Sequence, residues 1–428
     1  MLLRFEAANY RSILEPVELS MIAVDEDRPA ARSFDLLNER VLAIAGIYGP
    51  NASGKSNVVE ALAWLSMAVQ WSLRVWDKII PREPFKFGRG PHEPSRYEIE
   101  MVVAGIRYTY RVEVDGSTVL FEGLYSYPER RRRVLFERED LDISFRRGLG
   151  SLAGTRELLT PSTLALSAAM RLHEPDVEPF ARALASIQAL GLRRQGLWRS
   201  NGVVPPLDSP SSTERLFGQQ ETLFDEVGLA GHTGRSSALA LLRFADLGIY
   251  DVKIVQGEGG TGLAQQGSRR RSRLQLMHRV AGERIPFELS EESAGTQTWF
   301  ALIGPALSAL NDGRVLLVDE IDASLHPRLS ARLLELFQDP ETNPNDAQLI
   351  FTTHDTSLLN FLNRDEVWLT EKGDNGATTL TALAEYGGDK VRRSLNLERA
   401  YLQGRFGAVP DLDQYTLRRA LGLVPDES

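Results

Sequence analysis

The amino-acid sequence predicts an α/β fold that is built around a phosphate-binding loop. An apolar, strand-like run from Val41 to Ile47 leads into a glycine-rich loop, and helical spacing of apolar residues follows the loop. A second apolar run, Val315–Val318, ends in two carboxylates, and a third, Gln348–Thr352, ends close to a histidine. Continuous apolar runs of this length are typical of buried strands in α/β proteins.

Composition limits the function classes. The 428 residues are enough for two or three domains, and 43% apolar residues are ample for a core. The net charge of −9 excludes a global basic field that would recruit nucleic acid. Cysteine is absent, so disulfides and thiol chemistry are excluded. We find neither a signal peptide nor a membrane-spanning run, and we expect a cytoplasmic protein with no membrane partner.

The order of patterns predicts three domains. Residues 1–150 form an N-terminal lobe with the phosphate loop and an antiparallel sheet, because strand-like runs flank the Asp115-Gly116 turn signal. The expected strands are Tyr97–Val103, Arg107–Val114, Val119–Tyr127 and Arg133–Arg138. Residues 151–247 are a helical insertion, a lid or arm. The expected helices are Leu158–Met170, Glu178–Leu190, Ser212–Leu229 and Ser236–Leu247, with a loop at Val203–Ser212.

Residues 248–428 are the expected C-terminal lobe. A low-complexity loop, Gly257–Ser272, separates the first of its strands from the others. The expected strands are Asp251–Gln256, Arg273–Val280, Arg284–Leu289, 314–318 and 348–352, and the expected helices are 295–311 and 327–338.

The loop after Ile47 fits the pattern GxxxxGK[ST] at every fixed position. Gly49 and Gly54 let the backbone curl so that several N–H groups point inward, and the following helix adds its positive N-terminal dipole. Lys55 is expected to reach the β- and γ-phosphates, and Ser56 to hold Mg²⁺. The predicted nucleotide-binding residues of this loop are Gly49, Pro50, Asn51, Ala52, Ser53, Gly54, Lys55, Ser56 and Asn57.

The strand that ends in Asp319 and Glu320 has the Walker B pattern. Asp319 is expected to hold Mg²⁺ through water, and Glu320 to orient and polarise the attacking water. His354 follows the strand that ends at Thr352, 34 residues after Glu320, where it could donate to the γ-phosphate. The plainer alternatives are an acidic strand end and an ordinary surface histidine.

Ser293, Ala294, Gly295 and Thr296 precede the helix that leads to Walker B. A serine and a glycine at a helix N-terminus form an anion site. Within one chain this site is expected to lie far from the phosphate loop. It would act on nucleotide if a second protomer presented it across a two-fold interface. The alternative is a simple helix cap.

In this order the four motifs resemble the ABC-type ATPase heads of the SMC/RecF/OLD lineage. Phrases such as Asn9–Ile13, Arg243–Ile249, Glu292–Gln297, Asp319–Pro327 and Tyr401–Pro410 resemble the RecF-like AAA family ATPases of abortive-infection loci. The resemblance implies a P-loop NTPase head with an antiparallel β subdomain and a short helical insertion. It also implies ATP and Mg²⁺ as cofactors and an ATP-dependent homodimer or higher oligomer.

The resemblance assigns further residues. The polar turn after Glu320 is similar to a D-loop, with Asp322, Ser324 and Leu325. Arg11 and Ser12 are placed near the phosphates, although a solvated turn is the alternative. The chain departs from the family pattern twice. Its signature reads SAGTQ, and no clear Q-loop glutamine is present, since Gln70 lies on or just after the helix that follows the phosphate loop.

Several functions remain open at this point. The first is an ATPase switch in anti-phage defence that controls a separate effector such as a nuclease or toxin. Others are a RecF- or SMC-like DNA-repair ATPase and an ATP-bound scaffold with little turnover. DNA binding depends on Arg130–Arg133 and on Arg269–Arg271 with Arg273. A built-in nuclease is not expected, because only 74 residues follow His354 and Asp411-Leu412-Asp413 has no supporting acidic cluster.

Overall fold

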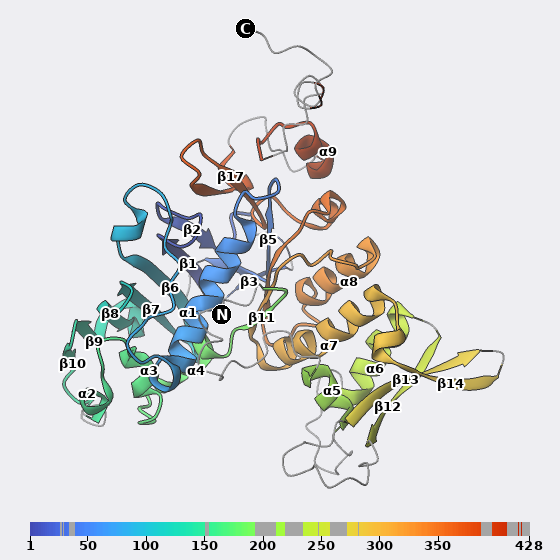
Figure 1. The fold of residues 1–428 in the computed structure, drawn as a ribbon, viewed down its shortest axis with the longest axis horizontal. Helices are drawn as coiled ribbons and strands as arrows, with labels where there is room; N and C mark the ends of the chain where they lie inside the picture. The colour runs from blue at the N-terminus through green and yellow to red at the C-terminus, as the bar shows by residue number, and fades with distance from the viewer. Residues whose placement is uncertain are drawn as a thin grey trace.

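A computed structural model gives the arrangement of the chain (Figure 1). The structure describes residues 1–25, 28, 30–33, 39–149, 154–192, 211–218, 234–246, 248–256, 272–280, 282–386, 396–408, 418 and 421. Within these ranges, no helix is both long and apolar enough to cross a lipid bilayer. Of the segments singled out above, the loop at 257–271, nearly all of the Val203–Ser212 loop and the Asp411–Asp413 segment lie outside the described residues.

A six-stranded sheet forms the centre of the molecule, in the order β11-β15-β16-β5-β17-β18. All neighbouring strands run parallel except the last pair, β17 and β18. The strands are β5 (Ile44–Tyr48), β11 (Gln188–Leu190), β15 (Val315–Val318), β16 (Gln348–Thr352), β17 (Val367–Lys372) and β18 (Thr378–Ala382). Because parallel strands share one carboxyl edge, the segments after β5, β15 and β16 meet there, as α/β sites require.

A seven-stranded antiparallel sheet, in the order β10-β9-β8-β7-β6-β1-β2, forms a second layer. The strands are β1 (Leu2–Ala8), β2 (Val17–Ser20), β6 (Ser95–Val103), β7 (Ile106–Val114), β8 (Val119–Ser126), β9 (Arg133–Glu139) and β10 (Asp142–Phe145). The side chain of Asp115 accepts hydrogen bonds from the N–H groups of Ser117 and Thr118, which closes the turn between β7 and β8. The expected antiparallel subdomain and the α/β class are therefore confirmed.

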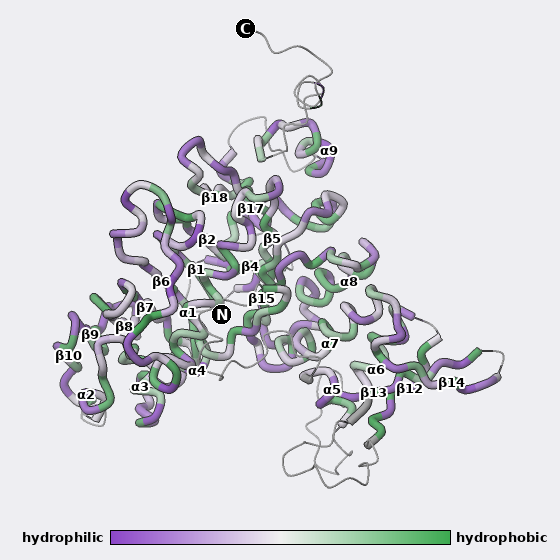
Figure 2. Tube along the Cα trace, viewed as in Figure 1, coloured by the Kyte–Doolittle hydropathy of each residue, from purple (hydrophilic) through white to green (hydrophobic). Residues whose placement is uncertain are grey.

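The helix after the phosphate loop, α1 (Lys55–Val75), lies between the two sheets, and apolar residues from both sheets join one core around it. Trp64 is fully buried and stacks on Tyr97 of β6, with ring centroids 4.4 Å apart. Figure 2 shows hydrophobic residues along the central strands, while the outer helix α8 carries both kinds. Burial of this helix on both sides fixes the position of its N-terminus at the carboxyl edge.

A second core lies on the other face of the central sheet. It contains α5 (Ser211–Gly218), α6 (Gly234–Ala245), α7 (Ala294–Asp312), α8 (Pro327–Gln338) and α9 (Leu397–Leu402). Beside these helices stands the three-stranded sheet of β12 (Ile249–Gln256), β13 (Ser272–Val280) and β14 (Glu283–Glu288). The remaining elements are β3 (Ala31–Ser33), β4 (Arg40–Leu42), α2 (Thr155–Leu158), α3 (Ala165–Ala169), α4 (Glu178–Ala185) and short 3₁₀ turns η1 (Gly90–His92), η2 (Pro128–Arg130), η6 (Leu289–Glu291), η7 (Thr356–Phe361) and η8 (Leu383–Glu385).

Two expected helices of the insertion are wrong in extent. Leu158–Met170 is divided into α2 and α3, because Pro161 and its neighbours form a non-helical turn. Glu178–Leu190 ends as a helix at Ala185, and its last residues form β11 of the central sheet. The expected strand from Val41 is likewise divided between β4 and β5. The separation of residues 151–247 as a domain stays a prediction, although α3 and α4 pack on α1 whereas α5 and α6 pack on α7.

Candidate nucleotide-binding site

The phosphate loop leaves β5 at the carboxyl edge and enters α1. Gly49 and Gly54 have φ angles of +149° and +105°, which side-chain-bearing residues rarely adopt. A Cβ atom at Gly49 would collide with Thr370 of β17, and a Cβ atom at Gly54 would collide with Thr378 of β18. Both glycines are therefore required by the close approach of the β17–β18 hairpin, in addition to the curl of the loop.

The β17–β18 hairpin supports the loop through hydroxyl groups. The Oγ atoms of Ser53 and Thr370 lie 2.6 Å apart, and Thr370 also donates to the carbonyl of Tyr48. The hydroxyl of Thr378 donates to the carbonyl of Ser53 over 2.7 Å and lies 2.7 Å from the Oγ of Ser12. The loop is thus held from behind by strands that enter the chain more than 300 residues later.

Lys55 is buried in the loop, and its Nζ donates to the carbonyl oxygens of Gly49 and Pro50 over 2.9 and 3.1 Å. Burial lowers the pKa of Lys55, and the nearby carboxylate of Asp319 opposes this effect. The backbone N–H groups of Gly54, Lys55 and Ser56 have no backbone acceptor among the described residues. An ammonium group and unused N–H groups at a helix N-terminus form a site for phosphate.

Arg11 and Ser12 lie in a turn beside the loop, but they have different partners. The side-chain amide of Asn57 on α1 donates to the Oγ of Ser12. The guanidinium of Arg11 is ion-paired with the buried Glu60 of α1 and with Glu83. Ser12 therefore lies at the phosphate loop as expected, whereas the charge of Arg11 is neutralised by two carboxylates.

Thr352, the last residue of β16, holds both Walker B residues. Its hydroxyl donates to Oδ1 of Asp319 over 2.6 Å and accepts the backbone N–H of Glu320 over 2.8 Å. Asp319 is buried, while Glu320 is exposed and has a φ of +53°. Strained backbone of this kind at a non-glycine residue is common in functional sites. The geometry leaves one oxygen of Asp319 for a cation and presents Glu320 to solvent, where a water can be oriented.

The D-loop and the histidine segment are joined. Oδ1 of Asp322 accepts the hydroxyl of Thr353 over 2.7 Å and the backbone N–H of His354 over 3.3 Å. The His354 side chain is exposed, Leu325 is buried, and Ser324 is exposed with a φ of +62°. Thus Glu320, Asp322 and His354 lie on two adjacent loops at the carboxyl edge.

The signature begins α7. The hydroxyl of Ser293 caps this helix by accepting the N–H of Thr296 over 3.1 Å, so the helix-cap alternative describes its local role. Ser293 and Ala294 are exposed. A Cβ atom at Gly295 would lie 2.9 Å from the carbonyl oxygen of Ser324, so the signature packs on the D-loop of its own chain. Among the described residues, no hydrogen bond joins the signature to the phosphate loop.

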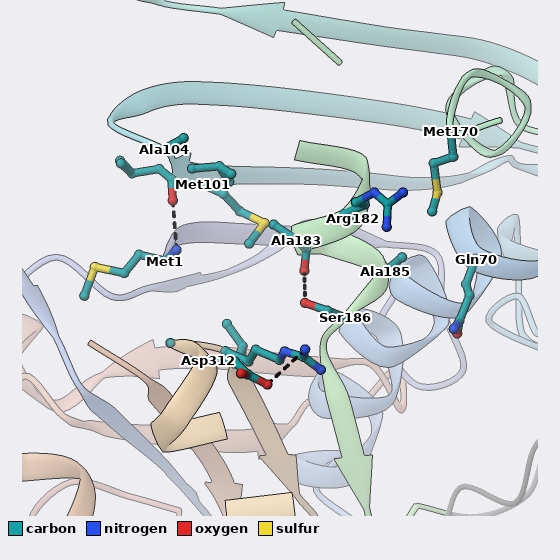
Figure 3. Close-up of a pocket in the computed structure, with 15 residues that line it drawn as sticks. Met1, Gln70, Met101, Ala104, Met170, Arg182, Ala183, Ala185, Ser186 and Asp312 are labelled. Atoms are coloured by element: carbon teal, nitrogen blue, oxygen red, sulfur yellow. Dashed lines mark hydrogen bonds and ion pairs between the residues drawn. The ribbon is translucent and has the colours of Figure 1, made fainter. Parts of the chain in front are cut away.

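Gln70 lies far along α1 and lines a cavity of about 720 Å³ (Figure 3). The cavity borders Met1 and Val315, at the amino end of β15, so it is on the edge opposite Asp319. Gln70 is therefore excluded as a Q-loop residue. The strand next to Walker B is β11, where the carbonyl of Leu190 accepts the N–H of Asp319 over 2.9 Å. Residues 193–210, which follow β11, lie outside the described residues.

Residues with supporting roles were missed by sequence reasoning. Thr352, Thr370 and Thr378 are buried threonines in strands, and hydroxyl groups at strand ends near a glycine loop are the only signal that could have indicated them. Of the basic clusters, Arg130–Arg133 is exposed, and Arg132 contacts Glu137 and the ring of Tyr125. Arg269–Arg271 lie outside the described residues.

Thr352→Val is expected to slow ATP hydrolysis by about 10-fold while ATP binding persists. Valine keeps the shape but removes the hydroxyl that fixes the Asp319 carboxylate and the Glu320 backbone. Loss of these two buried hydrogen bonds should also reduce the free energy of unfolding by about 1–3 kcal/mol. Phosphate release and denaturant titration measure the two effects. The exposed strand residue Thr379 supplies the control, and equal loss in Thr379→Val would contradict the role of Thr352.

Comparison with known proteins places this geometry in context. Residues 44–360 match the profile of the family described as "AAA domain, putative AbiEii toxin, Type IV TA system". Among solved structures, the chain is similar to the SmcHead bound to the C-winged helix domain of ScpA, with 14% identity, a TM-score of 0.44, and 89% of this chain and 97% of that chain covered. It is also similar to the SMC head domain from Thermotoga maritima, with 13% identity, a TM-score of 0.38, and coverages of 89% and 98%. The comparison with curated proteins gives no match.

Proposed function

Since the chain belongs to the AAA-domain family that its residues 44–360 match, it is a P-loop ATPase of the SMC/RecF-like lineage, and we propose that ATP closes two copies into a working dimer. The family match confirms the expected lineage and the expected ATPase activity. In the proposed cycle, ATP binding closes the dimer, hydrolysis reopens it, and the two states signal to a partner.

The observation that supports a dimer is the position of the signature. Ser293 caps α7 at an exposed helix N-terminus and packs through Gly295 on the D-loop, without a hydrogen bond to the phosphate loop among the described residues. The γ-phosphate needs donors on the side away from Lys55 to neutralise the charge that shifts during transfer. The N–H groups and hydroxyl of a second copy's signature can provide them.

The residues at the edge fit ATP with Mg²⁺. Ser56 supplies a hydroxyl and Asp319 a carboxylate, which are the hard oxygen ligands that Mg²⁺ prefers. Lys55 and the unused N–H groups of the first turn of α1 would bind the β- and γ-phosphates, and bound Mg²⁺ would neutralise charge on the transferring group. Glu320, whose backbone is fixed by Thr352, would orient the attacking water and accept its proton. His354 would donate to the γ-phosphate from the adjacent loop.

The biological role follows as a proposal from the family. The description of that family names an AbiEii toxin and a type IV toxin–antitoxin system. We propose that this ATPase is a sensor or switch in anti-phage defence that controls a separate effector, such as a nuclease or toxin. The exposed Arg130–Arg133 segment keeps a DNA-tethering role as the second candidate. Loss of DNA binding with rising salt and in a variant of this segment would favour the second candidate.

A mixing experiment tests the dimer directly. Lys55→Ala and Ser293→Arg are each expected to lack ATPase activity, the first through its phosphate loop and the second through its signature. A mixed dimer pairs the intact loop of the Ser293→Arg chain with the intact signature of the Lys55→Ala chain. Partial recovery of phosphate release is therefore expected when the two are mixed.

The matched control mixes Lys55→Ala with the double variant Lys55→Ala/Ser293→Arg, in which no intact phosphate loop exists and no activity should return. Recovery in this control, or full wild-type activity from a monomer at nanomolar concentration, would contradict the dimer. A wild-type dimer that binds ATP tightly but releases no phosphate would instead favour the scaffold alternative.

A further inference from the structure

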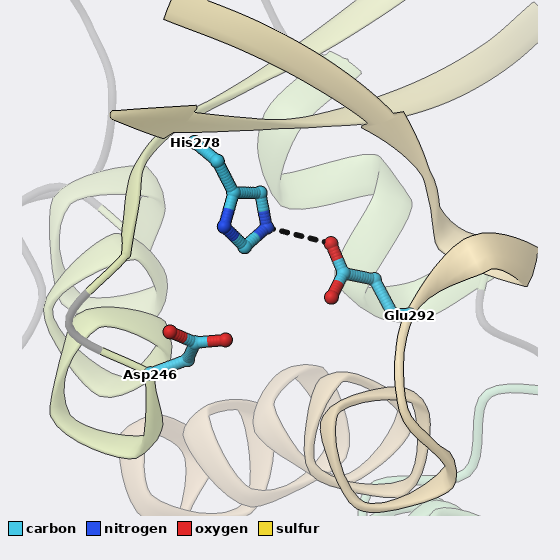
Figure 4. Close-up of side chains that lie close together, drawn as sticks. All are labelled: Asp246, His278 and Glu292. Carbon is cyan, nitrogen blue, oxygen red and sulfur yellow. Dashed lines mark hydrogen bonds and ion pairs between the residues drawn. The ribbon is translucent and has the colours of Figure 1, made fainter. Parts of the chain in front are cut away.

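Three ionisable side chains meet at the base of the signature, away from the nucleotide site. Asp246 follows α6, His278 is in β13, and Glu292 directly precedes Ser293 (Figure 4). One ligand-type atom from each residue lies within 4.8 Å of the others. Figure 4 shows the two carboxylates and an edge of the imidazole turned toward a common space.

The cluster is packed and largely enclosed. The side chain of Glu292 is 8% exposed and that of His278 is 14% exposed. Nε2 of His278 lies 2.7 Å from Oε1 of Glu292, and Oδ1 of Asp246 accepts the backbone N–H of Gly248 over 2.9 Å. A Cβ atom at Gly248 would lie 3.0 Å from Nδ1 of His278 and 3.1 Å from Oδ1 of Asp246. Only a glycine therefore leaves these two groups their present spacing.

The charge of the cluster is unbalanced. No arginine or lysine of the described residues lies within 4.0 Å of the carboxylates of Asp246 or Glu292. The second oxygen of Glu292 has no hydrogen-bond partner among the same residues. Other buried carboxylates of the molecule do have cationic partners, as Glu122 has Arg138 and Asp25 has Arg364. Enclosed carboxylates without a cation are costly, and bound cations are a usual solution.

We propose that Asp246, His278 and Glu292 bind a divalent transition-metal ion of the Zn²⁺ or Mn²⁺ class. One imidazole and two carboxylates form a mixed nitrogen and oxygen set that suits such ions better than Ca²⁺ or Mg²⁺. Ligand atoms at about 2.0–2.2 Å from a metal lie roughly 3–3.5 Å from each other, so small side-chain rotations bring the cluster to that spacing. Water fills the remaining positions.

The metal would join three separate elements at one point. It links the end of α6 and the middle of β13 to the residue that immediately precedes the signature serine. Metal ligands restrict the backbone next to them, so the ion would fix where the N-terminus of α7 points. This role does not depend on the Mg²⁺ that accompanies ATP, because it uses none of the nucleotide-site residues.

Metal binding to the full chain tests the proposal without nucleotide. Protein stripped with a chelator and dialysed is titrated calorimetrically with Zn²⁺ alone and with Mn²⁺ alone. Co²⁺ substitution supplies a spectroscopic signature through its visible absorption. One equivalent of metal is expected to bind to the wild type. His278→Gln and Glu292→Gln should each weaken binding by at least about 10–100-fold, the range found when even supporting residues of metal sites are changed.

Two controls separate this site from others. His173→Gln removes another histidine–glutamate pair, in which Nδ1 of His173 lies 2.9 Å from Glu178 without a second carboxylate in contact. Asp319→Asn removes the carboxylate expected to hold Mg²⁺. Both controls should keep the equivalent of metal.

The proposal is overturned if the wild type binds neither ion, a result that does not depend on any variant folding. It is also overturned if His278→Gln and Glu292→Gln, shown to be folded by circular dichroism, bind metal as the wild type does. Loss of metal in Asp319→Asn alone would move the ion to the nucleotide site. Because metal content is measured without ATP, these outcomes are independent of the ATPase cycle.

Discussion

Glu320→Gln is expected to bind ATP with nearly wild-type affinity and to hydrolyse it at least about 100-fold more slowly, the lower end of what a positioned general base contributes. The amide has the shape of the carboxylate but cannot accept the proton of the attacking water. The backbone at Glu320 is held by the Thr352 hydroxyl, so the loop geometry should survive the change. Asp319 remains for Mg²⁺, and binding to Lys55 is not affected.

Because hydrolysis is expected to reopen the dimer, this variant should accumulate as an ATP-bound dimer. Phosphate release measures turnover, and sedimentation in the presence of ATP and Mg²⁺ measures the dimer fraction. Glu341→Gln, at an exposed loop position, is the matched control and should behave as wild type. Hydrolysis by Glu320→Gln at the wild-type rate would exclude the role given to Glu320.

Lys55→Ala is expected to weaken ATP binding by at least about 100-fold. The ammonium group would contact the β- and γ-phosphates, and two charge-assisted contacts at about 1.5–3 kcal/mol each correspond to that loss or more. In the nucleotide-free protein the same group donates to the carbonyl oxygens of Gly49 and Pro50. Alanine therefore removes both the cation and two contacts that hold the loop.

Calorimetric titration with ATP and Mg²⁺ measures the affinity. Lys372→Ala, at the exposed end of β17, removes a lysine near the same edge without removing the proposed phosphate ligand. A thermal melt without nucleotide then tells whether the Lys55→Ala loop remains folded. Equal ATP affinity for Lys55→Ala and the wild type would be incompatible with a phosphate site at this loop.

The parts of the fold that the sequence predicted well are those in which local pattern and chemistry agree. The glycine loop, the strand before Asp319 and the strand before His354 each carry a continuous apolar run and a polar end, and all three lie at one edge as strands of one sheet. The β7–β8 turn was found because Asp115-Gly116 is a strong local signal.

Features that depend on distant partners were missed. Gln188–Leu190 continues the helical pattern of α4, but pairing with β15 makes it a strand, and three residues are too few to show an alternation. The roles of Thr352 and Thr378 depend on side chains that lie more than 30 and 300 residues away, respectively. The pairing of Arg11 with Glu60 is of the same kind, because an isolated arginine gives no sign of which carboxylate neutralises it.

The position of β5 between β16 and β17 has a consequence for biosynthesis. Gly46 is aligned with Phe351 on one side and with Val367 on the other, so both neighbours are made about 300 residues later. At about 5–20 residues per second, a ribosome needs roughly 15–60 s to produce that length. For all of this time the apolar strand before the phosphate loop has no sheet to join and is open to chaperones. A nascent chain that stops before Phe351 therefore carries the phosphate-loop sequence without the sheet that gives it its shape.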